Sequence, residues 1–191
     1  MRRVRVIPCL LIQGNGLVKT KRFKDPVYVG DPVNAMRIFS DKEADEIVVL
    51  DIEASKSGAE PNYQLISEMA GEAFMPMAYG GGVTSVEQIR RLIRCGIEKV
   101  VINSAAVRSK DWIHEAVGIF GSQAIVGAVD VKKSIFGGYR VVTRSATEDT
   151  KLDLEQHIAS LVAAGVGEIL LNSVDRDGTM SGYDLPLIQQ I

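Results

Sequence analysis

The stretch Ile125-Val126-Gly127-Ala128-Val129-Asp130 decides the fold, because it repeats Val6-Ile7-Pro8-Cys9-Leu10-Leu11 near the start of the chain. A second pair of similar segments, EIVVL at 46–50 and EILLN at 168–172, follows at nearly the same offset. Short aliphatic runs that recur in this way indicate a duplicated strand–helix scaffold. The two copies differ at their last residue: the segment at 125–130 ends in Asp130, whereas the segment at 6–11 ends in Leu11. The sequence therefore predicts that half of a pair of carboxylates is missing.

Strands and helices alternate along the whole chain. We expect strands near 4–11, 46–51, 74–79, 98–103, 123–130 and 168–174, each a β-branched or aliphatic run typical of a parallel sheet buried on both faces. Asp31-Pro32 predicts the start of one helix, and Ser85-Val86-Glu87-Gln88 predicts a capping box for another helix that ends at Gly96. Apolar spacing predicts further helices around 112–119 and 158–162, and Gly137-Gly138 predicts a short hairpin over 132–145.

Six strand–helix units favour either a TIM-like barrel or a doubly wound sheet. The internal duplication favours the barrel. An eight-fold barrel typically needs about 250 residues, whereas this chain has 191 and stops inside its sixth helix. We therefore expect a single α/β domain over 1–191 that is either a barrel truncated after about six units or one that another chain completes.

Composition excludes several classes of function. The net charge is −2 with acids and bases interspersed, which speaks against a nucleic-acid or membrane surface. No apolar run is long enough to span a membrane, so we expect a cytoplasmic protein. Cys9 and Cys95 lack the spacing of a metal or redox motif and are expected to be buried thiols. His114 and His157 stand alone in expected helices, so we expect both to be solvated, with no metal and no cofactor.

Three aspartates follow strand segments at the end where parallel α/β folds place their chemistry: Asp51, Asp130 and Asp177. A carboxylate at the end of an apolar strand is costly unless it meets a ligand, a proton or a donor. The alternative is that each is a structural aspartate that caps the following turn. Three acids on one rim favour general acid/base or electrostatic work, and the absence of Glu at these positions argues against a two-carboxylate glycosidase.

Glycines and small polar residues mark the same rim. Gly80-Gly81-Gly82 lets backbone N–H groups approach a ligand, and Asn103 and Ser104 follow the next strand, so the sequence favours a phosphate site over a tight turn that merely needs glycine. Gly178 could contribute to a second phosphate site.

The opposite rim carries two residues of each sign at or just before strand starts: Arg5, Glu46, Lys99 and Glu168. The plain interpretation is that these are charged residues that protect strand starts. The alternative is a neutral ring that closes the base of a barrel.

Over nearly all its length the chain resembles the HisF family, the cyclase subunits of imidazole glycerol phosphate synthase. The motifs that carry the resemblance are Ile7-Pro8-Cys9-Leu10, Gly30-Asp31-Pro32, Leu50-Asp51-Ile52, Tyr79-Gly80-Gly81-Gly82, Ile102-Asn103-Ser104-Ala105-Ala106-Val107, Phe120-Gly121-Ser122-Gln123 and Asp175-Arg176-Asp177-Gly178-Thr179-Met180-Ser181-Gly182-Tyr183-Asp184.

The resemblance implies a (β/α)8 barrel of the ribulose-phosphate-binding type that pairs with a HisH-like glutaminase in a heterodimer. Ammonia from the glutaminase would pass through the barrel to a phosphosugar. The residues that match family positions are Asp130 for catalysis; Lys19, Gly82, Asn103, Ser104 and Gly178 for substrate and phosphate; Arg5, Glu46, Lys99 and Glu168 for the ammonia gate; and Glu98 and Gln123 for the glutaminase interface. From their places in the sequence we also expect Asp51 and Asp177 to support catalysis, and Gly81 and Ser173 to contribute to the substrate and phosphate site.

The second catalytic aspartate of the family falls at position 11, where this chain has Leu11. Leucine cannot transfer a proton, and losing a positioned acid or base typically costs about 10²–10⁴-fold in rate. The segment Pro8-Cys9-Leu10-Leu11 and the loop of residues 21–26 resemble those of a HisF-like branch linked to acetamidino-sugar formation in surface-polysaccharide synthesis. That branch implies a phosphorylated sugar or nucleotide-sugar substrate and a third amidotransferase protein. The alternatives are the histidine-pathway cyclase and a non-catalytic module that docks the glutaminase or channels its ammonia.

Overall fold

The two copies of the duplicated segment lie in two different structural units. The computed structural model describes residues 4–109, 111–134 and 137–191. Its backbone contacts divide the chain into one unit of Met1–Val18 with Tyr28–Val101 and another of Lys19–Val27 with Ile102–Ile191. The strands β2 (Gly16–Lys21) and β3 (Lys24–Gly30) run across the division. The expectation of one domain over 1–191 stays a prediction.

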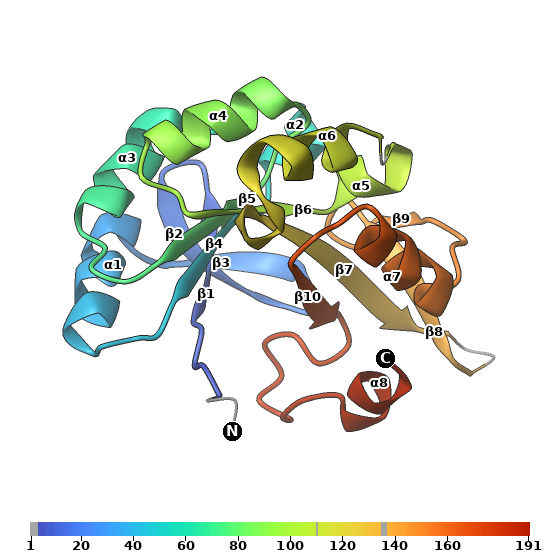
Figure 1. Cartoon of the computed structure of the whole chain (residues 1–191). Helices are drawn as coiled ribbons and strands as arrows, with labels where there is room; N and C mark the ends of the chain where they lie inside the picture. The colour runs from blue at the N-terminus through green and yellow to red at the C-terminus, as the bar shows by residue number, and fades with distance from the viewer. Residues whose placement is uncertain (1–3, 110, 135–136) are drawn as a thin grey trace. The chain divides into compact units, whose positions relative to one another are not determined.

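The first unit is a parallel sheet extended by a hairpin. Its strands are β1 (Cys9–Gln13), β4 (Ile47–Asp51), β5 (Met77–Gly80) and β6 (Lys99–Ile102), which pair in that order, and β2 adds to β1 in the antiparallel sense. The helices are α1 (Pro32–Asp41), α2 (Ala54–Ser57), α3 (Tyr63–Gly71) and α4 (Val86–Arg94). Figure 1 shows α1, α3 and α4 in a row along the strands, where their apolar faces bury side chains such as Met36, Ile66 and Ile89.

The second unit has one parallel strand pair and an antiparallel extension. β10 (Glu168–Ser173) pairs in parallel with β7 (Ile125–Lys133), which continues through β8 (Tyr139–Thr143) to β9 (Glu148–Asp149). The helical elements are α5 (Ser104–Arg108), α6 (Asp111–Phe120), the 3₁₀ turn η1 (Ser122–Ala124), α7 (Leu154–Ala163) and α8 (Leu185–Gln190). Parallel strands that alternate with helices confirm the predicted α/β class.

Strand pairing confirms the internal duplication within each unit. Leu11 pairs with Leu50 and, across a hairpin, with Val18. Asp130 pairs in the same way with Asn172 and, across a hairpin, with Val142. Each copy is therefore a strand followed by an antiparallel hairpin and then by a parallel neighbour.

Several predicted strand boundaries were wrong. Residues 4–8 lie outside β1, and both Leu11 and Asp130 stand inside their strands, because β1 continues to Gln13 and β7 to Lys133. Residues 74–76 precede β5, where Pro76 cannot donate a backbone hydrogen bond. The strands β2 and β3 were not predicted, although the two-residue turn Gly14-Asn15, with Gly14 at φ 57°, is a typical hairpin connection.

The predicted helix starts are confirmed with one change. Asp31 accepts a hydrogen bond from the Asn34 N–H, and Ser85 accepts one from the Gln88 N–H. The second half of the capping box differs from the prediction, since Gln88 Oε1 accepts from the Thr84 N–H at 2.7 Å. Gly96, at φ 99°, follows the end of α4 as predicted. The predicted hairpin is present as the β7–β8 pair, although residues 135 and 136 of its turn lie outside the described residues.

Three predictions about burial were wrong. Cys9 is exposed, because it begins β1 rather than lying in its middle, and Cys95 is only half-buried at the end of α4. His157 is buried, because it shares the inner face of α7 with Leu154 and Leu161, whereas His114 is exposed as expected. Within the described ranges, no helix is long and apolar enough to cross a membrane.

Candidate active site

Asp130 is a buried carboxylate within β7 of the second unit. It lies in β7, is only 5% exposed, and accepts one hydrogen bond on each oxygen. Asn103 Nδ2 donates to Oδ2 at 2.7 Å, and Asn172 Nδ2 donates to Oδ1 at 2.8 Å. The predicted phosphate ligand Asn103 is therefore a partner of Asp130 in this structure.

Burial governs the acidity of this group. It raises the pKa of Asp130 from 3.8 to about 6, while the two asparagine hydrogen bonds act in the opposite direction and the Asp177 carboxylate adds to the increase. A carboxylate with a pKa near 6 can accept and return a proton close to neutral pH. The prediction of an acid/base group at Asp130 thus has a physical basis.

The first unit has no carboxylate at the equivalent position. Leu11 and its strand partner Leu50 occupy the places that Asp130 and Asn172 occupy in the second unit. Both members of the polar pair are thus replaced by leucine in the first copy. Neither leucine can transfer a proton or donate a hydrogen bond.

Asp51 caps a turn. Its Oδ1 accepts from the N–H groups of Glu53 and Ala54, both at 2.9 Å, at the start of α2. This geometry matches the alternative that this acid has a structural role, while a catalytic role for Asp51 stays a prediction.

The glycines beside Asp51 allow close approach of the chain to itself. A Cβ on Gly81, at φ 128°, would lie 2.6 Å from the Asp51 Cβ. A Cβ on Gly82, at φ 69°, would lie 2.6 Å from the Ala59 carbonyl oxygen. The Gly82 N–H donates weakly to Ser55 Oγ at 3.4 Å. Local packing therefore accounts for glycine here, and phosphate binding at Gly81 and Gly82 stays a prediction.

Asp177 anchors a separate segment of the second unit. Its Oδ2 accepts from Thr20 Oγ1 at 2.9 Å and from the Phe23 N–H at 3.1 Å, and its carbonyl oxygen accepts from the Arg22 N–H. A Cβ on Gly178 would meet the Thr20 carbonyl oxygen. Asp177 thus holds the β2–β3 turn. Lys19 lies in β2, directly before Thr20, and is exposed.

The remaining predicted ligands of this unit have protein partners. Ser104 Oγ accepts from the Arg144 N–H at 3.4 Å. Ser173 Oγ donates to the buried carboxylate of Asp184 at 3.1 Å, which also accepts from the Tyr139 hydroxyl at 2.8 Å. Burial alone would raise the pKa of Asp184, but these hydrogen bonds and the nearby Lys133 charge hold it below its usual value.

A cavity of about 330 Å³ lies beside the end of β10, the loop that follows it and α8. Its lining combines polar groups of Asn172, Ser173 and Asp177 with apolar surface from Phe23 and Leu187. Such a mixture of apolar walls and a few directed polar groups is typical of a small-molecule site. In the described parts of the chain, no three or more His, Cys, Asp or Glu side chains are placed to hold a metal ion.

Three of the four predicted gate residues meet. Glu46 is 3% exposed, and its Oε2 lies 2.7 Å from both Arg5 Nη1 and Lys99 Nζ. Glu168 begins β10 in the second unit. Arg5, which is exposed and precedes β1, and Lys99 therefore pair with the buried Glu46, as the ring hypothesis requires, while closure of the ring by Glu168 stays a prediction.

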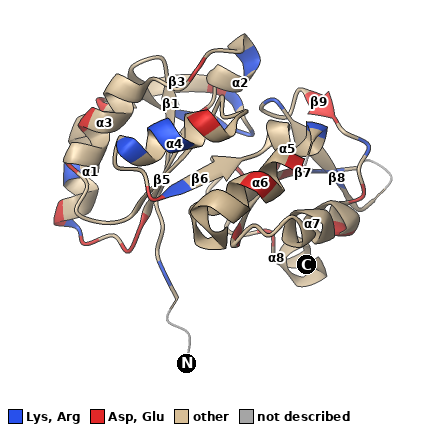
Figure 2. Cartoon of the chain, turned by 45° about the horizontal axis from the view of Figure 1, so that its top comes forward, with Lys and Arg blue, Asp and Glu red and all other residues tan. Residues whose placement is uncertain are grey.

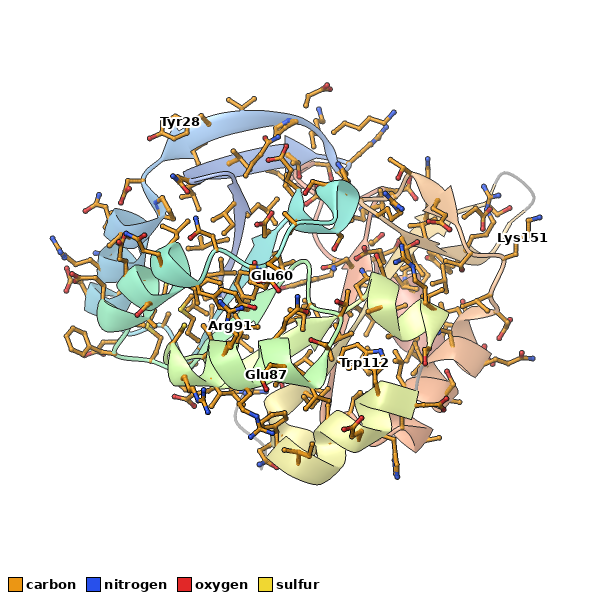
Figure 3. All side chains as sticks on the ribbon, turned by 90° about the horizontal axis from the view of Figure 1, so that it is seen from above. Tyr28, Glu60, Glu87, Arg91, Trp112 and Lys151 are labelled. Atoms are coloured by element: carbon orange, nitrogen blue, oxygen red, sulfur yellow. The ribbon has the colours of Figure 1, made fainter. Side chains whose placement is uncertain are left out.

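The predicted interface residues are both exposed. Glu98 precedes β6, and Gln123 lies in η1 with its Nε2 donating to the Phe120 carbonyl. Figure 2 shows charges of both signs along the helices, including the basic residues of α4. One of these, Arg91, lies 3.7 Å above the Tyr63 ring and pairs with Glu60 at 3.1 Å (Figure 3), which is a structural contact between α4 and the α3 region.

Sequence reasoning missed Asn172 as a site residue. A signal was present, because the alignment that matches Asp130 with Leu11 also matches Asn172 with Leu50. The Asp184–Tyr139 contact was also missed, since it joins the start of β8 to the residue before α8, 45 positions further along the chain.

Comparison with known proteins agrees with this arrangement. A family model described as "Histidine biosynthesis protein" matches residues 5–191. A Pseudomonas aeruginosa protein named "Putative imidazole glycerol phosphate synthase subunit hisF2" is 50% identical over all of this chain and 76% of its own length. A Leptospira borgpetersenii protein named "Putative imidazole glycerol phosphate synthase subunit HisF" is 47% identical, again over 100% of this chain and 76% of its own length. The Thermobifida fusca protein named "Imidazole glycerol phosphate synthase subunit HisF" is 41% identical over 98% of this chain and 75% of its own length. The chain therefore belongs to the histidine biosynthesis protein family of TIM-barrel proteins, and within it to the HisF-like subunits.

Proposed function

We propose that this chain is the synthase subunit of a glutamine amidotransferase system that adds ammonia to a phosphate-bearing sugar. A HisH-like glutaminase partner supplies the ammonia, and the preferred setting is acetamidino-sugar formation for a surface polysaccharide. Family membership supports the amidotransferase part of the proposal. The relative from Pseudomonas aeruginosa, at 50% identity, and the relative from Thermobifida fusca, at 41%, are both named as imidazole glycerol phosphate synthase subunits, which supports the HisF-like part of the proposal.

The observation that carries the proposal is that only one of the two equivalent strand positions, 11 and 130, carries a carboxylate. Asp130 is buried, oriented by two amides and raised in pKa to about 6, whereas Leu11 and Leu50 stand at the equivalent positions. Addition of ammonia to a carbonyl carbon needs a base that accepts a proton from the attacking nitrogen. In this step a C–N bond forms and the C–O bond of the acetamido group breaks: the ammonia nitrogen gives up two protons, and the oxygen leaves with them as water, so that the amide becomes an amidine. One positioned base suffices for such a step. The resemblance to the HisF family implies that ring closure in the histidine pathway uses two catalytic aspartates.

Two other functions have support of their own. The relatives' names support a histidine-pathway cyclase. The absence of an acid at position 11 supports a module that docks the glutaminase and channels ammonia without catalysis. In that second case the exposed Glu98 would matter more than Asp130.

One experiment separates catalysis from docking. The chain is reconstituted with a HisH-like glutaminase, the third amidotransferase and a nucleotide-linked acetamido sugar, and product is measured with glutamine or with free ammonium. Asp130→Asn is expected to lose about 10²-fold or more of the activity with either nitrogen source, while glutaminase binding by calorimetry is unchanged.

Charge-reversal variants test glutaminase docking separately from catalysis. Glu98→Lys should weaken glutaminase binding and glutamine-dependent turnover yet keep ammonium-dependent turnover. Glu115→Lys, an exposed change on α6, should alter neither. Full product formation by Asp130→Asn would contradict the catalytic proposal and favour the docking module.

A further inference from the structure

Asp130 is held as a hydrogen-bond acceptor on both of its oxygens. The donors are the side-chain NH₂ groups of Asn103, at 2.7 Å, and Asn172, at 2.8 Å. An ionised carboxylate accepts on both oxygens, whereas a protonated one must use one oxygen as a donor. Two amide donors therefore favour the charged form and fix the plane of the carboxylate.

Asn172 is well suited to orient Asp130 because of its place in the sheet. The two residues are direct partners in the parallel pair of β7 and β10. Side chains of direct partners project from the same face of a sheet, and neighbouring strands lie about 4.8 Å apart. The next residue, Ser173, is tied to the buried Asp184 carboxylate, which fixes the end of β10.

The duplication shows that this pair changes as a unit. Leu11 and Leu50 are the corresponding partners in β1 and β4, so the copy that lacks the acid also lacks its amide. Asn103 contributes from a different place, as the residue that precedes α5.

From this geometry we propose that Asn172 is a positioning residue for the reaction: it orients the Asp130 carboxylate and keeps it ready to accept a proton. The catalytic consequence rests on the proposed function. The orienting contact itself can be measured on the chain alone.

The charges around Asp130 set the direction of the expected change. Burial raises the pKa of Asp130, the hydrogen bonds from Asn172 and Asn103 lower it, and the carboxylate of Asp177 raises it. Removal of the Asn172 amide should therefore move the titration of Asp130 upward. Since a hydrogen bond from an amide stabilises the charged carboxylate, the shift should be about one pH unit or more.

The direct test is a ¹³C NMR titration of the Asp130 carboxyl group in the free 191-residue chain. Asn172→Ala should raise the titration midpoint, and Asn172→Asp should raise it further because it adds a like charge. Asn34→Asp, the same substitution at an exposed site on α1, should leave it unchanged. Asn172→Ser serves as the second variant if Asn172→Ala does not fold, and it too should raise the midpoint. A wild-type midpoint in the folded variants would overturn the proposal.

Activity provides the second readout, with the glutaminase complex and ammonium as the nitrogen source. Asn172→Ala should lower kcat about tenfold and move the acidic limb of the pH–rate profile upward by the NMR shift. A lower kcat with an unmoved pH limb would show a merely structural role and overturn the proposal. If wild type converts no sugar while the NMR midpoint still moves as expected, the proposed function fails and the orienting role of Asn172 stands.

Discussion

At the scale of single residues, the site depends on a contrast between two equivalent positions. The sequence predicted this contrast, because Leu11 and Asp130 align in the repeat. It did not predict the role of Asn172, since the direction in which a strand residue points toward its neighbour depends on register. It placed Asp51 and Asp177 correctly beside strand ends, but the hydrogen bonds that occupy them follow from loop geometry that composition does not encode.

The raised pKa of Asp130 predicts a specific dependence of stability on pH. The folded state holds the proton more tightly than the unfolded state, with a pKa of about 6 compared with 3.8. The contribution of Asp130 to stability is therefore fully present below about pH 4 and is lost as pH rises to about 6, by about 3 kcal/mol in all. Asp184, whose pKa is lowered, acts in the opposite sense and at lower pH, where its contribution is lost as pH falls.

Urea unfolding between pH 4 and 7 checks this expectation. Asp130→Asn should remove the part of the pH dependence that falls between pH 4 and 6. Asp111→Asn, at an exposed position of α6, should retain the wild-type curve in that range. Identical curves for wild type and Asp130→Asn would show that Asp130 titrates as an ordinary carboxyl group.

At the scale of elements, helix starts with capping residues were easier to predict than strand boundaries, whereas α2, α3 and α5 were not located from the sequence. The starts of α1 and α4 are encoded locally by Asp31-Pro32 and by Ser85, and both were found. Strand boundaries depend on partners far along the chain, so β1 and β7 extend beyond the residues that the apolar pattern indicated. The β2–β3 segment was missed because its residues are mostly polar or exposed, and a buried face is what the pattern detects.

The loop after β10 offers a matched pair of glycines. Gly178 (φ 63°) and Gly182 (φ 75°) both have left-handed backbone conformations, but a Cβ meets the Thr20 backbone only at Gly178 and meets nothing within 4 Å at Gly182. Gly182→Ala should cost about 1 kcal/mol of unfolding free energy, the usual penalty for this backbone conformation. Gly178→Ala should cost more, because the β2–β3 turn must also move.

Thermal or urea denaturation of the two variants gives the comparison. Amide exchange at Arg22 and Phe23, whose N–H groups bond to Asp177, should accelerate in Gly178→Ala alone. Equal stability losses in the two variants would contradict the close contact between this turn and Gly178.

At the scale of the whole molecule, the chain is a duplicated α/β protein whose copies have diverged in chemistry. In each unit a strand is followed by an antiparallel hairpin and paired with a parallel neighbour. The repeat predicted the strands, and Gly137-Gly138 predicted the hairpin after β7, but the hairpin after β1 was not predicted. What distinguishes the copies is polarity: Asp130 with Asn172 in one, Leu11 with Leu50 in the other. The central claim is that this divergence leaves one proton-transfer group and so disfavours the two-acid reaction of the histidine pathway.

The most direct test is the initial rate at which the glutaminase complex converts the histidine-pathway ribonucleotide, measured for wild type, Leu11→Asp and Leu11→Asn. If position 11 limits the reaction, wild type should be slower than Leu11→Asp by about 10²-fold or more. Leu11→Asn, which is polar but cannot transfer a proton, should stay as slow as wild type. Wild-type turnover equal to that of Leu11→Asp would contradict the claim and assign the chain to the histidine pathway.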